Sequence, residues 1–277
     1  MSCFKAGAFT FPLGKKTYIM GILNATPDSF SDGGLYSDPA AAARRALEMQ
    51  ELGADIIDIG AESTRPGAAA IGETAEIRRL APVLEELRNK LSVPLSVDTR
   101  HTAVARFALE NGASVINDVS GKPEAAMAEA VKASGAGWII MHNPCGSSEV
   151  AEYPHGVIRA VREFFKESLA AAEAFGVSPD RVCLDPGIGF GKTHADNLLL
   201  LRSVSEIKIS GVCLLAGASR KRVVGIAAGE ERPEKRAAGT VAAHTAAIAG
   251  GADIIRAHDV AEAAQGAAVA DALFRKR

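Results

Sequence analysis

One pattern repeats along the chain: a short apolar run ends in polar residues, a helical stretch follows, and the next apolar run begins. The apolar runs are rich in Ile, Val and Leu and mostly do not alternate with polar residues, which is typical of strands covered on both faces. Eight of them occur, at residues 17–23, 55–60, 94–97, 114–116, 137–141, 181–184, 212–216 and 253–255. Alternating strands and helices predict a parallel sheet with right-handed crossovers, and eight units predict a closed (β/α)8 TIM barrel. An open doubly wound sheet is the alternative.

The segments between the apolar runs have the features of helices. Ser37, Asp38 and Pro39 combine a cap with a first-turn proline and predict a helix that continues to about Glu51. Residues 72–88 place Ile and Leu at helical spacing and predict a second helix. Helix stops are predicted just before three strands, at Asn111 and Gly112, Phe175 and Gly176, and Gly250 and Gly251.

The residues before the first barrel strand predict a small addition to the barrel. Residues 8–13 and 16–19, with Gly14 between them, predict a β-hairpin that covers the barrel bottom. The sequence contains no linker, low-complexity tract or break in composition, and its 277 residues suit a single barrel. Residues 1–277 are therefore predicted to form one domain.

The charge balance and cysteine content exclude several classes of protein. The formal net charge is −2, so no global basic field is available to hold nucleic acid or an anionic membrane. The four cysteines form no CxxC pair, no HExxH motif occurs, and the six histidines do not cluster in sequence, so zinc is not expected. Because the chain has no apolar leader and no apolar stretch of membrane length, we expect a cytoplasmic protein.

Polar or ionisable residues follow every one of the eight predicted strands. They are Asn24, Glu62 to Thr64, Asp98, Asn117 and Asp118, His142 and Asn143, Asp185, Ser219 to Lys221, and Arg256 to Asp259. At any one strand such a residue often only caps a helix or makes a hydrogen bond within a loop, and Asp118 and Asp259 resemble caps more than ligands. In a barrel, however, all carboxyl ends of the strands converge on one rim, where barrel enzymes have their active sites. Two long connections at that rim, residues 25–36 and 61–71, are predicted to be binding loops.

The charges are divided around this rim. Asp98, Asn117 and Asp185 place acceptors on one side, and a cationic group from the last two strands lies on the other. That group consists of Arg220, Lys221, Arg256 and His258. Barrels frequently bind phosphate after strands seven and eight, although a surface salt-bridge network is the alternative for these cations. Buried acceptors suit a heterocycle with adjacent N–H groups, so the rim predicts a ligand with a nitrogen heterocycle at one end and phosphate at the other.

One glycine-rich segment lies close to a phosphate-binding motif without matching it. Residues 185–193 resemble a P-loop, but Pro186 occupies a position where that motif needs glycine. A tight glycine turn after the sixth strand is the simpler interpretation.

The strand-end sequences together resemble the dihydropteroate synthase family. The matching segments are residues 21–34 (GILNATPDSFSDGG), 62–67 (ESTRPG), 96–99 (SVDT), 116–119 (INDV), 185–192 (DPGIGFGK), 219–221 (SRK) and 256–260 (RAHDV). They span nearly the whole chain in the order typical of that family. The resemblance implies a condensation of p-aminobenzoate with 6-hydroxymethyl-7,8-dihydropterin pyrophosphate, which gives 7,8-dihydropteroate and pyrophosphate.

The resemblance also implies roles for individual residues. Those implied to hold the pterin are Asp98, Asn117, Asp185 and Lys221, with Met141 and Arg256 against its two faces. Those implied to hold the pyrophosphate are Thr64, Arg256, His258 and, through Mg²⁺, Asn24. Those implied to border p-aminobenzoate are Ser219, Phe190, Phe30, Arg65 and Pro66. The implied catalytic group is Lys221, Asp185, Arg256, His258 and Asp98. A homodimer and competition by sulfonamide drugs at the p-aminobenzoate position are implied as well.

Two features depart from the family pattern, and two other functions stay open. Arg222 stands where a small residue is common, and residues 143–153 match nothing to which a role can be assigned. The alternative functions are a pterin-dependent corrinoid methyltransferase and a catalytically silent pterin-binding paralogue. A plain sugar-phosphate barrel enzyme is disfavoured by the acceptors at the rim.

Overall fold

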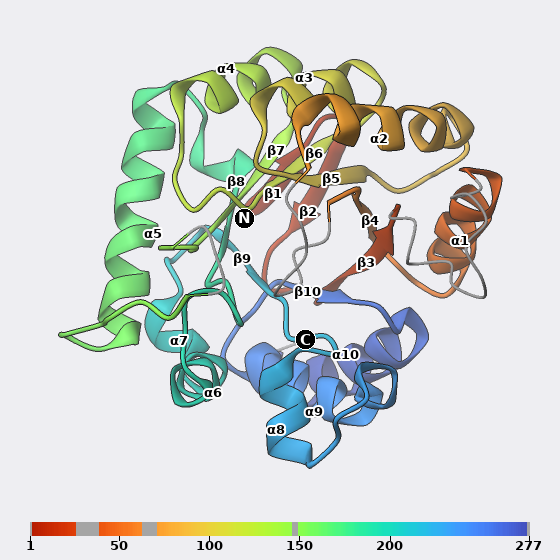
Figure 1. Ribbon diagram of the computed structural model, residues 1–277. Helices are drawn as coiled ribbons and strands as arrows, with labels where there is room; N and C mark the ends of the chain where they lie inside the picture. Colours follow the sequence, from red (N-terminus) through yellow and green to blue (C-terminus); the bar gives the residue numbers. More distant parts are fainter. Residues whose placement is uncertain (1, 26–38, 63–70, 146–148, 276–277) are drawn as a thin grey trace.

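The computed structural model describes residues 2–25, 39–62, 71–145 and 149–275. Eight parallel strands close into a barrel in the order β10-β3-β4-β5-β6-β7-β8-β9, and the helices surround it (Figure 1). The barrel strands are β3 (Tyr18–Asn24), β4 (Ile56–Gly60), β5 (Leu95–Thr99), β6 (Val115–Asp118), β7 (Gly137–Met141), β8 (Val182–Asp185), β9 (Cys213–Ala216) and β10 (Ile254–Ala257). The predicted closed barrel is confirmed, and the open sheet is not what forms.

Several strands extend one or two residues beyond their predicted ends. Asp98 pairs with Asn117 between β5 and β6, and Asp185 pairs with Met141 between β8 and β7. Polar residues that were expected to follow the strands therefore belong to the sheet ladder. Backbone hydrogen bonds of the barrel fix their positions, which makes the rim rigid at these points.

The helices occupy the segments that were expected to be helical. They are α1 (Pro39–Glu51), α2 (Glu73–Leu87), α3 (Thr102–Glu110), α4 (Ala125–Ser134), α5 (Val157–Ala174), α6 (His194–Arg202), α7 (Val204–Ile207), α8 (Arg222–Ala228), α9 (Ala237–Ala249) and α10 (Val260–Phe274). The stops at Asn111, Phe175 and Gly250 are confirmed, because each is the C-cap of its helix. The predicted cap at Ser37 and Asp38 lies outside the described residues. No helix in the described part of the chain is long and apolar enough to cross a membrane.

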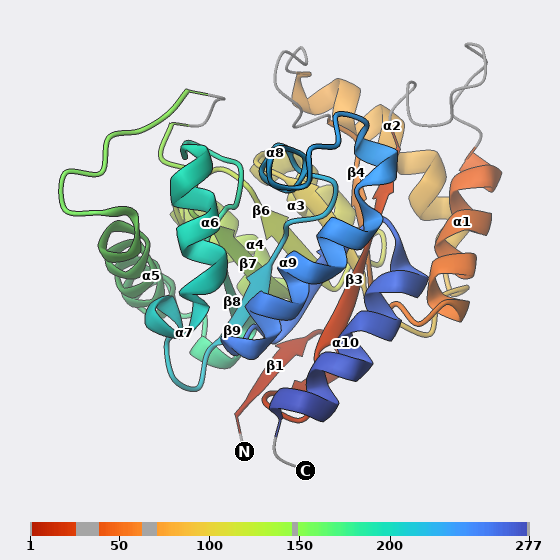
Figure 2. The same ribbon diagram turned by 90° about the horizontal axis from the view of Figure 1, so that it is seen from below.

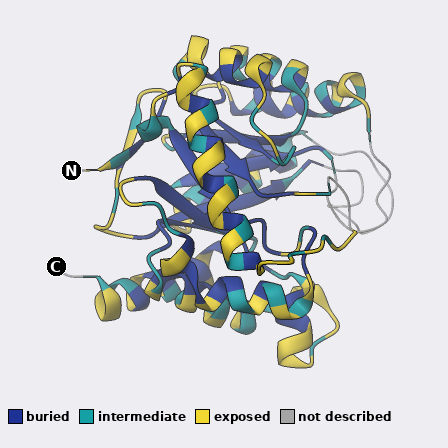
Figure 3. Cartoon of the chain, turned by 90° about the vertical axis from the view of Figure 1, so that its left-hand side faces the viewer, coloured by how far each residue is buried: buried dark blue, intermediate teal, exposed yellow. Residues whose placement is uncertain are grey.

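Successive strand residues alternate between two separate cores. On β7, Trp138 and Ile140 point outward to the helices, while Ile139 points into the barrel. Figure 3 shows the result: the barrel strands are buried along almost their whole length, and the helices around them expose their outer faces. This double coverage explains why the strand sequences are apolar at consecutive positions.

The N-terminal hairpin forms, but its strands are not the predicted ones. It consists of β1 (Cys3–Ala6) and β2 (Phe9–Pro12), with Gly7 in the turn at φ +58°. The prediction of a turn at Gly14 with a strand over 16–19 was wrong, because Tyr18 and Ile19 belong to β3 and pair with β10. The left-handed backbone at Gly7 suits glycine, which makes the earlier turn possible.

The hairpin closes the bottom of the barrel, as predicted. Phe4 is fully buried and belongs to the same apolar cluster as Tyr18, Ile139 and Leu215. A Cβ atom at Gly137 would come within 2.5 Å of the Phe4 ring, so β7 needs glycine there to admit the phenylalanine. Figure 2 shows β1 and both chain termini at this same end of the barrel. The opposite end, where the carboxyl ends of the strands meet, is therefore the one that can hold a site.

Candidate active site

An ion-pair network joins the inner faces of three strands at the carboxyl end of the barrel. The guanidinium of Arg256 on β10 donates from Nε to Oδ2 of Asp58 over 2.6 Å and from Nη2 to Oδ2 of Asp98 over 2.7 Å. Ser96 Oγ and Asn117 Nδ2 also donate to Asp58, over 2.6 and 3.1 Å. The predicted residues Arg256, Asp98 and Asn117 are thus brought together around a carboxylate that sequence reasoning missed.

Asp58 was missed because it lies inside an apolar run, the β4 sequence Ile-Ile-Asp-Ile-Gly. The sequence did contain a feature that could have revealed it: a single carboxylate in a fully buried strand needs a partner. Asp58 is completely buried and points toward the barrel axis, where Arg256 supplies that partner.

Burial raises the pKa of Asp98, and the nearby carboxylate of Asp58 raises it further, while Arg256 lowers it. The pKa of Arg256 lies above its ordinary value, because the attraction of Asp58 and Asp98 exceeds the effect of burial. Two carboxylates share one guanidinium, so the network lacks positive charge. A ligand that offers N–H donors or a delocalised cation would relieve that shortage.

Asp185, the last residue of β8, and Lys221, the N-cap residue of α8, form a second group. Oδ1 of Asp185 accepts a 2.7 Å hydrogen bond from Gly187 N. The Lys221 ammonium donates to the carbonyl of Ile188 and lies 4.7 Å from the centre of the Phe190 ring. Burial lowers the pKa of Lys221 to about 8, and Asp185 opposes that shift. Burial also raises the pKa of Asp185, with Lys221 opposing.

The glycine-rich segment after β8 is a tight turn, as interpreted from the sequence. Gly187 has φ +63°, and a Cβ there would overlap the carbonyl of His142. Inside the turn the buried ammonium of Lys192 donates to three carbonyls, those of His142, Gly187 and Phe190, over 3.2, 3.0 and 2.8 Å. Sequence reasoning gave Lys192 no role of its own. It ties the turn to β7 and so positions Phe190.

Ser219 and His258 contact each other beside this group. Ser219 Oγ lies 3.0 Å from His258 Nδ1 and accepts a 3.1 Å hydrogen bond from His258 N. The hydroxyl therefore fixes the orientation of the imidazole. Both residues follow neighbouring strands, β9 and β10, as the predicted phosphate position requires.

Arg220 does not face the predicted anion site. Its Nε donates to Oδ2 of Asp259 over 2.9 Å, and its Nη2 also donates to Asp259. The salt-bridge alternative therefore holds for Arg220. Asp259 is at the N-cap position of α10, but its side chain caps no backbone N–H and pairs with Arg220 instead. Arg222 is exposed at the start of α8.

Other strand-end residues have structural roles. Asp118 accepts hydrogen bonds from Trp138 Nε1 over 3.1 Å and from Ser120 N over 3.0 Å. The prediction that Asp118 caps a helix was wrong, because the N-cap of α4 is Glu124. His142 packs against Phe164, and burial lowers its pKa to about 3, so the imidazole is neutral.

One predicted ligand residue has an unused acceptor. Oδ1 of Asn117 is buried and has no hydrogen-bond partner in the described part of the chain. A buried acceptor without a donor costs about 1–3 kcal/mol, which a ligand N–H would recover.

The remaining predicted residues lie at other strand ends or outside the described residues. Met141 is buried at the end of β7, and Asn24 is half-buried at the end of β3. The predicted residues Phe30, Thr64, Arg65 and Pro66 lie outside the described residues.

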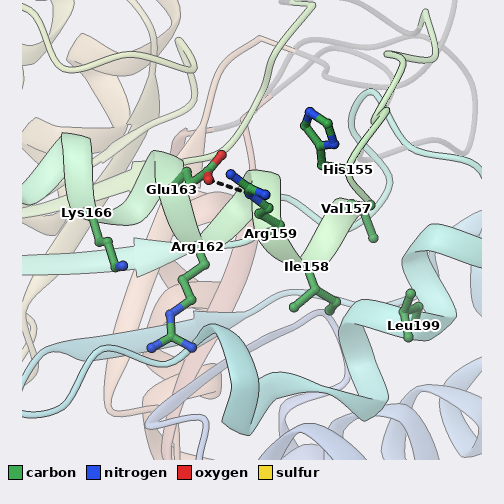
Figure 4. A pocket seen from close by; sticks show the side chains of 9 residues that line it. His155, Val157, Ile158, Arg159, Arg162, Glu163, Lys166 and Leu199 are labelled. Carbon is green, nitrogen blue, oxygen red and sulfur yellow. Dashed lines mark hydrogen bonds and ion pairs between the residues drawn. The ribbon is translucent and has the colours of Figure 1, made fainter.

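A surface hollow lies elsewhere, away from the barrel mouth. Its volume is about 380 Å³, and Figure 4 shows it along α5, beside Leu199 of α6. Arg159 in its wall pairs with Glu163 over 2.7 Å. None of the predicted site residues lines this hollow, and its polar side chains are those of an exposed helix face. The candidate active site remains the barrel mouth.

Comparison with known proteins shows the class of enzyme and the family to which the chain belongs. A family model described as a pterin binding enzyme matches residues 20–258. The chain is thus a pterin-binding enzyme built on a barrel. It is 45% identical over 273 residues to a dihydropteroate synthase of Synechocystis sp., covering 97% of this chain and 94% of that relative. The chain therefore belongs to the dihydropteroate synthase family, which makes it a transferase of folate biosynthesis.

Two solved structures support this assignment at the level of the fold. The Xanthomonas albilineans dihydropteroate synthase with 4-aminobenzoic acid is 41% identical, has a TM-score of 0.92 and covers 100% of both chains. The Burkholderia cenocepacia dihydropteroate synthase complexed with 7,8-dihydropteroate is 37% identical, with a TM-score of 0.87, and the match covers 98% of this chain and 96% of that one.

Proposed function

We propose that the barrel mouth joins p-aminobenzoate to 6-hydroxymethyl-7,8-dihydropterin pyrophosphate and releases 7,8-dihydropteroate and pyrophosphate. The observation that carries the proposal is the convergence of three buried acceptors, Asp98, Asn117 and Asp185, with the cations Lys221 and Arg256. The Xanthomonas and Burkholderia enzymes have been solved with 4-aminobenzoic acid and with 7,8-dihydropteroate, which are one substrate and the product of this reaction.

The pterin is proposed to bind to the acceptors of β5, β6 and β8. A pterin presents adjacent ring and exocyclic N–H groups, which match carboxylate and amide oxygens. The unpaired Oδ1 of Asn117 and the second oxygen of Asp185 are available for such donors. The Lys221 ammonium is proposed to move from the Ile188 carbonyl to a pterin acceptor. Met141 and Arg256 are proposed to lie against the two ring faces.

The pyrophosphate is proposed to bind at the opposite side of the mouth, with Thr64, Arg256 and His258. During the reaction the amine nitrogen of p-aminobenzoate bonds to the pterin methylene carbon while the C–O bond to pyrophosphate breaks. The leaving group takes the bonding electron pair, and the amine releases a proton to solvent. Arg256 and His258 stabilise the negative charge that develops, and one well-placed donor of this kind is worth about 3 kcal/mol.

A Mg²⁺ ion is proposed to bind beside Asn24. The chemistry of this donor fits: the side-chain amide provides a hard oxygen at the carboxyl end of β3 and is half-buried rather than enclosed. Mg²⁺ usually takes only one or two protein ligands and completes its shell with water and substrate phosphates. When bound it would supply charge neutralisation for the pyrophosphate.

The p-aminobenzoate is proposed to lie among Ser219, Phe190, Phe30, Arg65 and Pro66, next to the pterin methylene. Lys192 fixes the turn that carries Phe190, so the aromatic wall of this position is preorganised. Sulfonamide drugs are proposed to compete there. The Yersinia pestis synthase, 38% identical with a TM-score of 0.90 and matched over 98% of both chains, has been solved with a sulfonamide drug.

The chain is further proposed to act as one domain over residues 1–277, in a homodimer, in the cytoplasm. Support for a dimer comes from apolar side chains that are at least half exposed on the helical flank. They are Ile226 on α8 and Val269, Leu273 and Phe274 on α10.

The test is pyrophosphate release by the purified protein supplied with the pterin pyrophosphate and Mg²⁺, with and without p-aminobenzoate. Release that requires p-aminobenzoate and yields dihydropteroate supports the proposal. Pterin binding without turnover would favour a silent paralogue. A bound corrinoid, detected by its absorption spectrum, would favour the methyltransferase alternative.

A further inference from the structure

Three ligating side chains meet just outside the barrel mouth, although they are far apart in sequence. Glu62 follows β4, Glu76 lies in the first turn of α2, and His101 is the N-cap residue of α3. One carboxylate oxygen or imidazole nitrogen from each residue lies within 4.8 Å of those of the other two. Helices α2 and α3 run side by side at this position (Figure 1). None of the three residues belongs to the site proposed above.

Glu76 is the unusual member of this cluster. Its side chain is fully buried, and among the described residues neither carboxylate oxygen has a hydrogen bond of regular geometry, although the Thr99 hydroxyl lies close enough to favour the ionised form. A buried ionised carboxylate without partners is strongly unfavourable. Burial raises the pKa of Glu76 to about 7, and the nearby charges of Glu62 and Asp98 add to the shift, while the Thr99 hydroxyl opposes it.

The other two members also have atoms without a hydrogen bond that could ligate a metal ion. Nε2 of His101 is buried and has no hydrogen-bond partner among the described residues. Glu62 accepts hydrogen bonds from Arg100 over 2.6 Å and from Ile71 N over 3.2 Å, both at Oε1, so these bonds leave Oε2 for another ligand. Two carboxylates and an imidazole therefore lie together, and Arg100 forms an ion pair with one of them, Glu62.

We propose that Glu62, Glu76 and His101 form a binding site for one divalent transition-metal ion of the Zn²⁺ class. Carboxylate oxygen and neutral imidazole nitrogen are both ordinary ligands of Zn²⁺, whereas Mg²⁺ and Ca²⁺ take oxygen ligands almost alone. Three protein ligands leave at least one position for water. The ion would connect the end of β4 with the starts of α2 and α3.

The simpler alternative is that a proton occupies the cluster and Glu76 is a neutral acid. In the proposal a metal ion neutralises the buried carboxylate, and in the alternative a proton does. A measurement of metal binding therefore distinguishes the two explanations. The experiment uses the full-length protein, treated with a chelator and then dialysed, and titrates it with Zn²⁺ by calorimetry. Co²⁺ serves as a second probe, because its visible absorption reports the ligand geometry.

Three variants make the test specific. Glu76→Gln and His101→Gln each remove one ligand while preserving size approximately. Glu73→Gln is the matched control, because Glu73 is an exposed acid on the same helical turn, 3.7 Å from His101 Nδ1 but outside the cluster. Melting temperatures without metal establish that each variant is folded.

We expect one Zn²⁺ per chain in the wild type, with an excess of Mg²⁺ failing to displace it. Loss of a direct ligand is expected to weaken binding by more than the roughly 10–100-fold that loss of an outer-shell partner costs. Glu73→Gln removes a carboxylate that lies beside the ring but ligates nothing, so it is expected to weaken binding by no more than that outer-shell cost, and the metal-induced rise in melting temperature should vanish only in the two ligand variants. Absence of stoichiometric Zn²⁺ binding to the wild type, or equal binding by folded Glu76→Gln and His101→Gln proteins, would overturn the proposal and leave a protonated Glu76 as the explanation.

Discussion

Arg256 Nε donates a 2.6 Å hydrogen bond to Oδ2 of Asp58 across the barrel mouth, between residues 198 positions apart in the chain. The bond links β10 to β4, and Asp58 is itself held by Ser96 and Asn117. The guanidinium that is proposed to contact both pterin and pyrophosphate is therefore oriented by a buried carboxylate that need not touch either substrate.

Asp58→Asn is expected to impair the enzyme without removing any proposed substrate ligand. The substitution leaves Arg256 with Asp98 as its one remaining carboxylate partner, and loss of a hydrogen bond to a charged group costs about 1.5–3 kcal/mol. We expect kcat/KM for the pterin pyrophosphate to fall at least tenfold and the free energy of unfolding to fall by about 2 kcal/mol. Steady-state kinetics and urea denaturation measure the two effects. Ser96→Ala, which keeps the Asp58–Arg256 pair, should change both far less, and an equal loss in both variants would contradict the argument.

Lys221→Ala and Arg222→Ala form a matched pair of adjacent substitutions. Lys221 lies in the site beside Asp185 and Phe190, whereas Arg222 is exposed on α8. We expect Lys221→Ala to lower turnover roughly 100-fold or more, as loss of one site donor does in other enzymes. Arg222→Ala should remain near the wild-type rate. Dihydropteroate formation under saturating substrates is the measurement, and similar rates for the two variants would remove Lys221 from the site.

Lys192 is expected to make stability depend on pH in a particular direction. Burial lowers its pKa from 10.5 to about 7 in the folded protein. Between about pH 7 and pH 10 the unfolded chain thus binds more protons at this residue, so the stability contribution rises with pH, by at most about 1.4 kcal/mol per pH unit. The difference between wild type and Lys192→Met in urea denaturation, measured across that range, reports this term. A difference that is constant, or that falls with pH, would show that the lysine stays charged.

Gly137→Ala is expected to destabilise the protein mainly through its contact with Phe4. The added methyl would lie 2.5 Å from the Phe4 ring, and overpacking of this kind typically costs 1–3 kcal/mol. In a Phe4→Leu background the same substitution should cost distinctly less. A double-mutant cycle by denaturant unfolding measures the coupling. Zero coupling would mean that the hairpin does not pack under β7 in solution.

The sequence was sufficient to predict the barrel because strands that are apolar on both faces indicate a parallel sheet covered by helices, and eight strand–helix units favour closure into a barrel over an open doubly wound sheet. It was not sufficient to place the hairpin, because Gly7 and Gly14 are both plausible turn residues and only the packing of Phe4 against Gly137 chooses between them.

Site residues could be predicted from the sequence where a polar side chain stands at the end of a strand. They could not be predicted where a side chain acts through contacts with segments far away in the chain. Asp58 was hidden inside an apolar run, and Lys192 acts through three carbonyls that come from two loops. Arg220 was assigned to the anion site from its position beside Lys221. In the structure its backbone is left-handed, with φ +57°, and its side chain pairs with Asp259. The pattern of a single sequence does not reveal that backbone conformation.

The central claim is that the carboxyl ends of β5, β6 and β8 recognise the pterin. Its most direct test is the equilibrium binding of the pterin pyrophosphate, without p-aminobenzoate, to the wild type and to Asp185→Asn. The account predicts that the amide variant, which exchanges one acceptor for a donor but keeps its shape, binds roughly 100-fold more weakly while its melting temperature stays near that of the wild type. Equal affinity in the two proteins would contradict the account and place the pterin elsewhere.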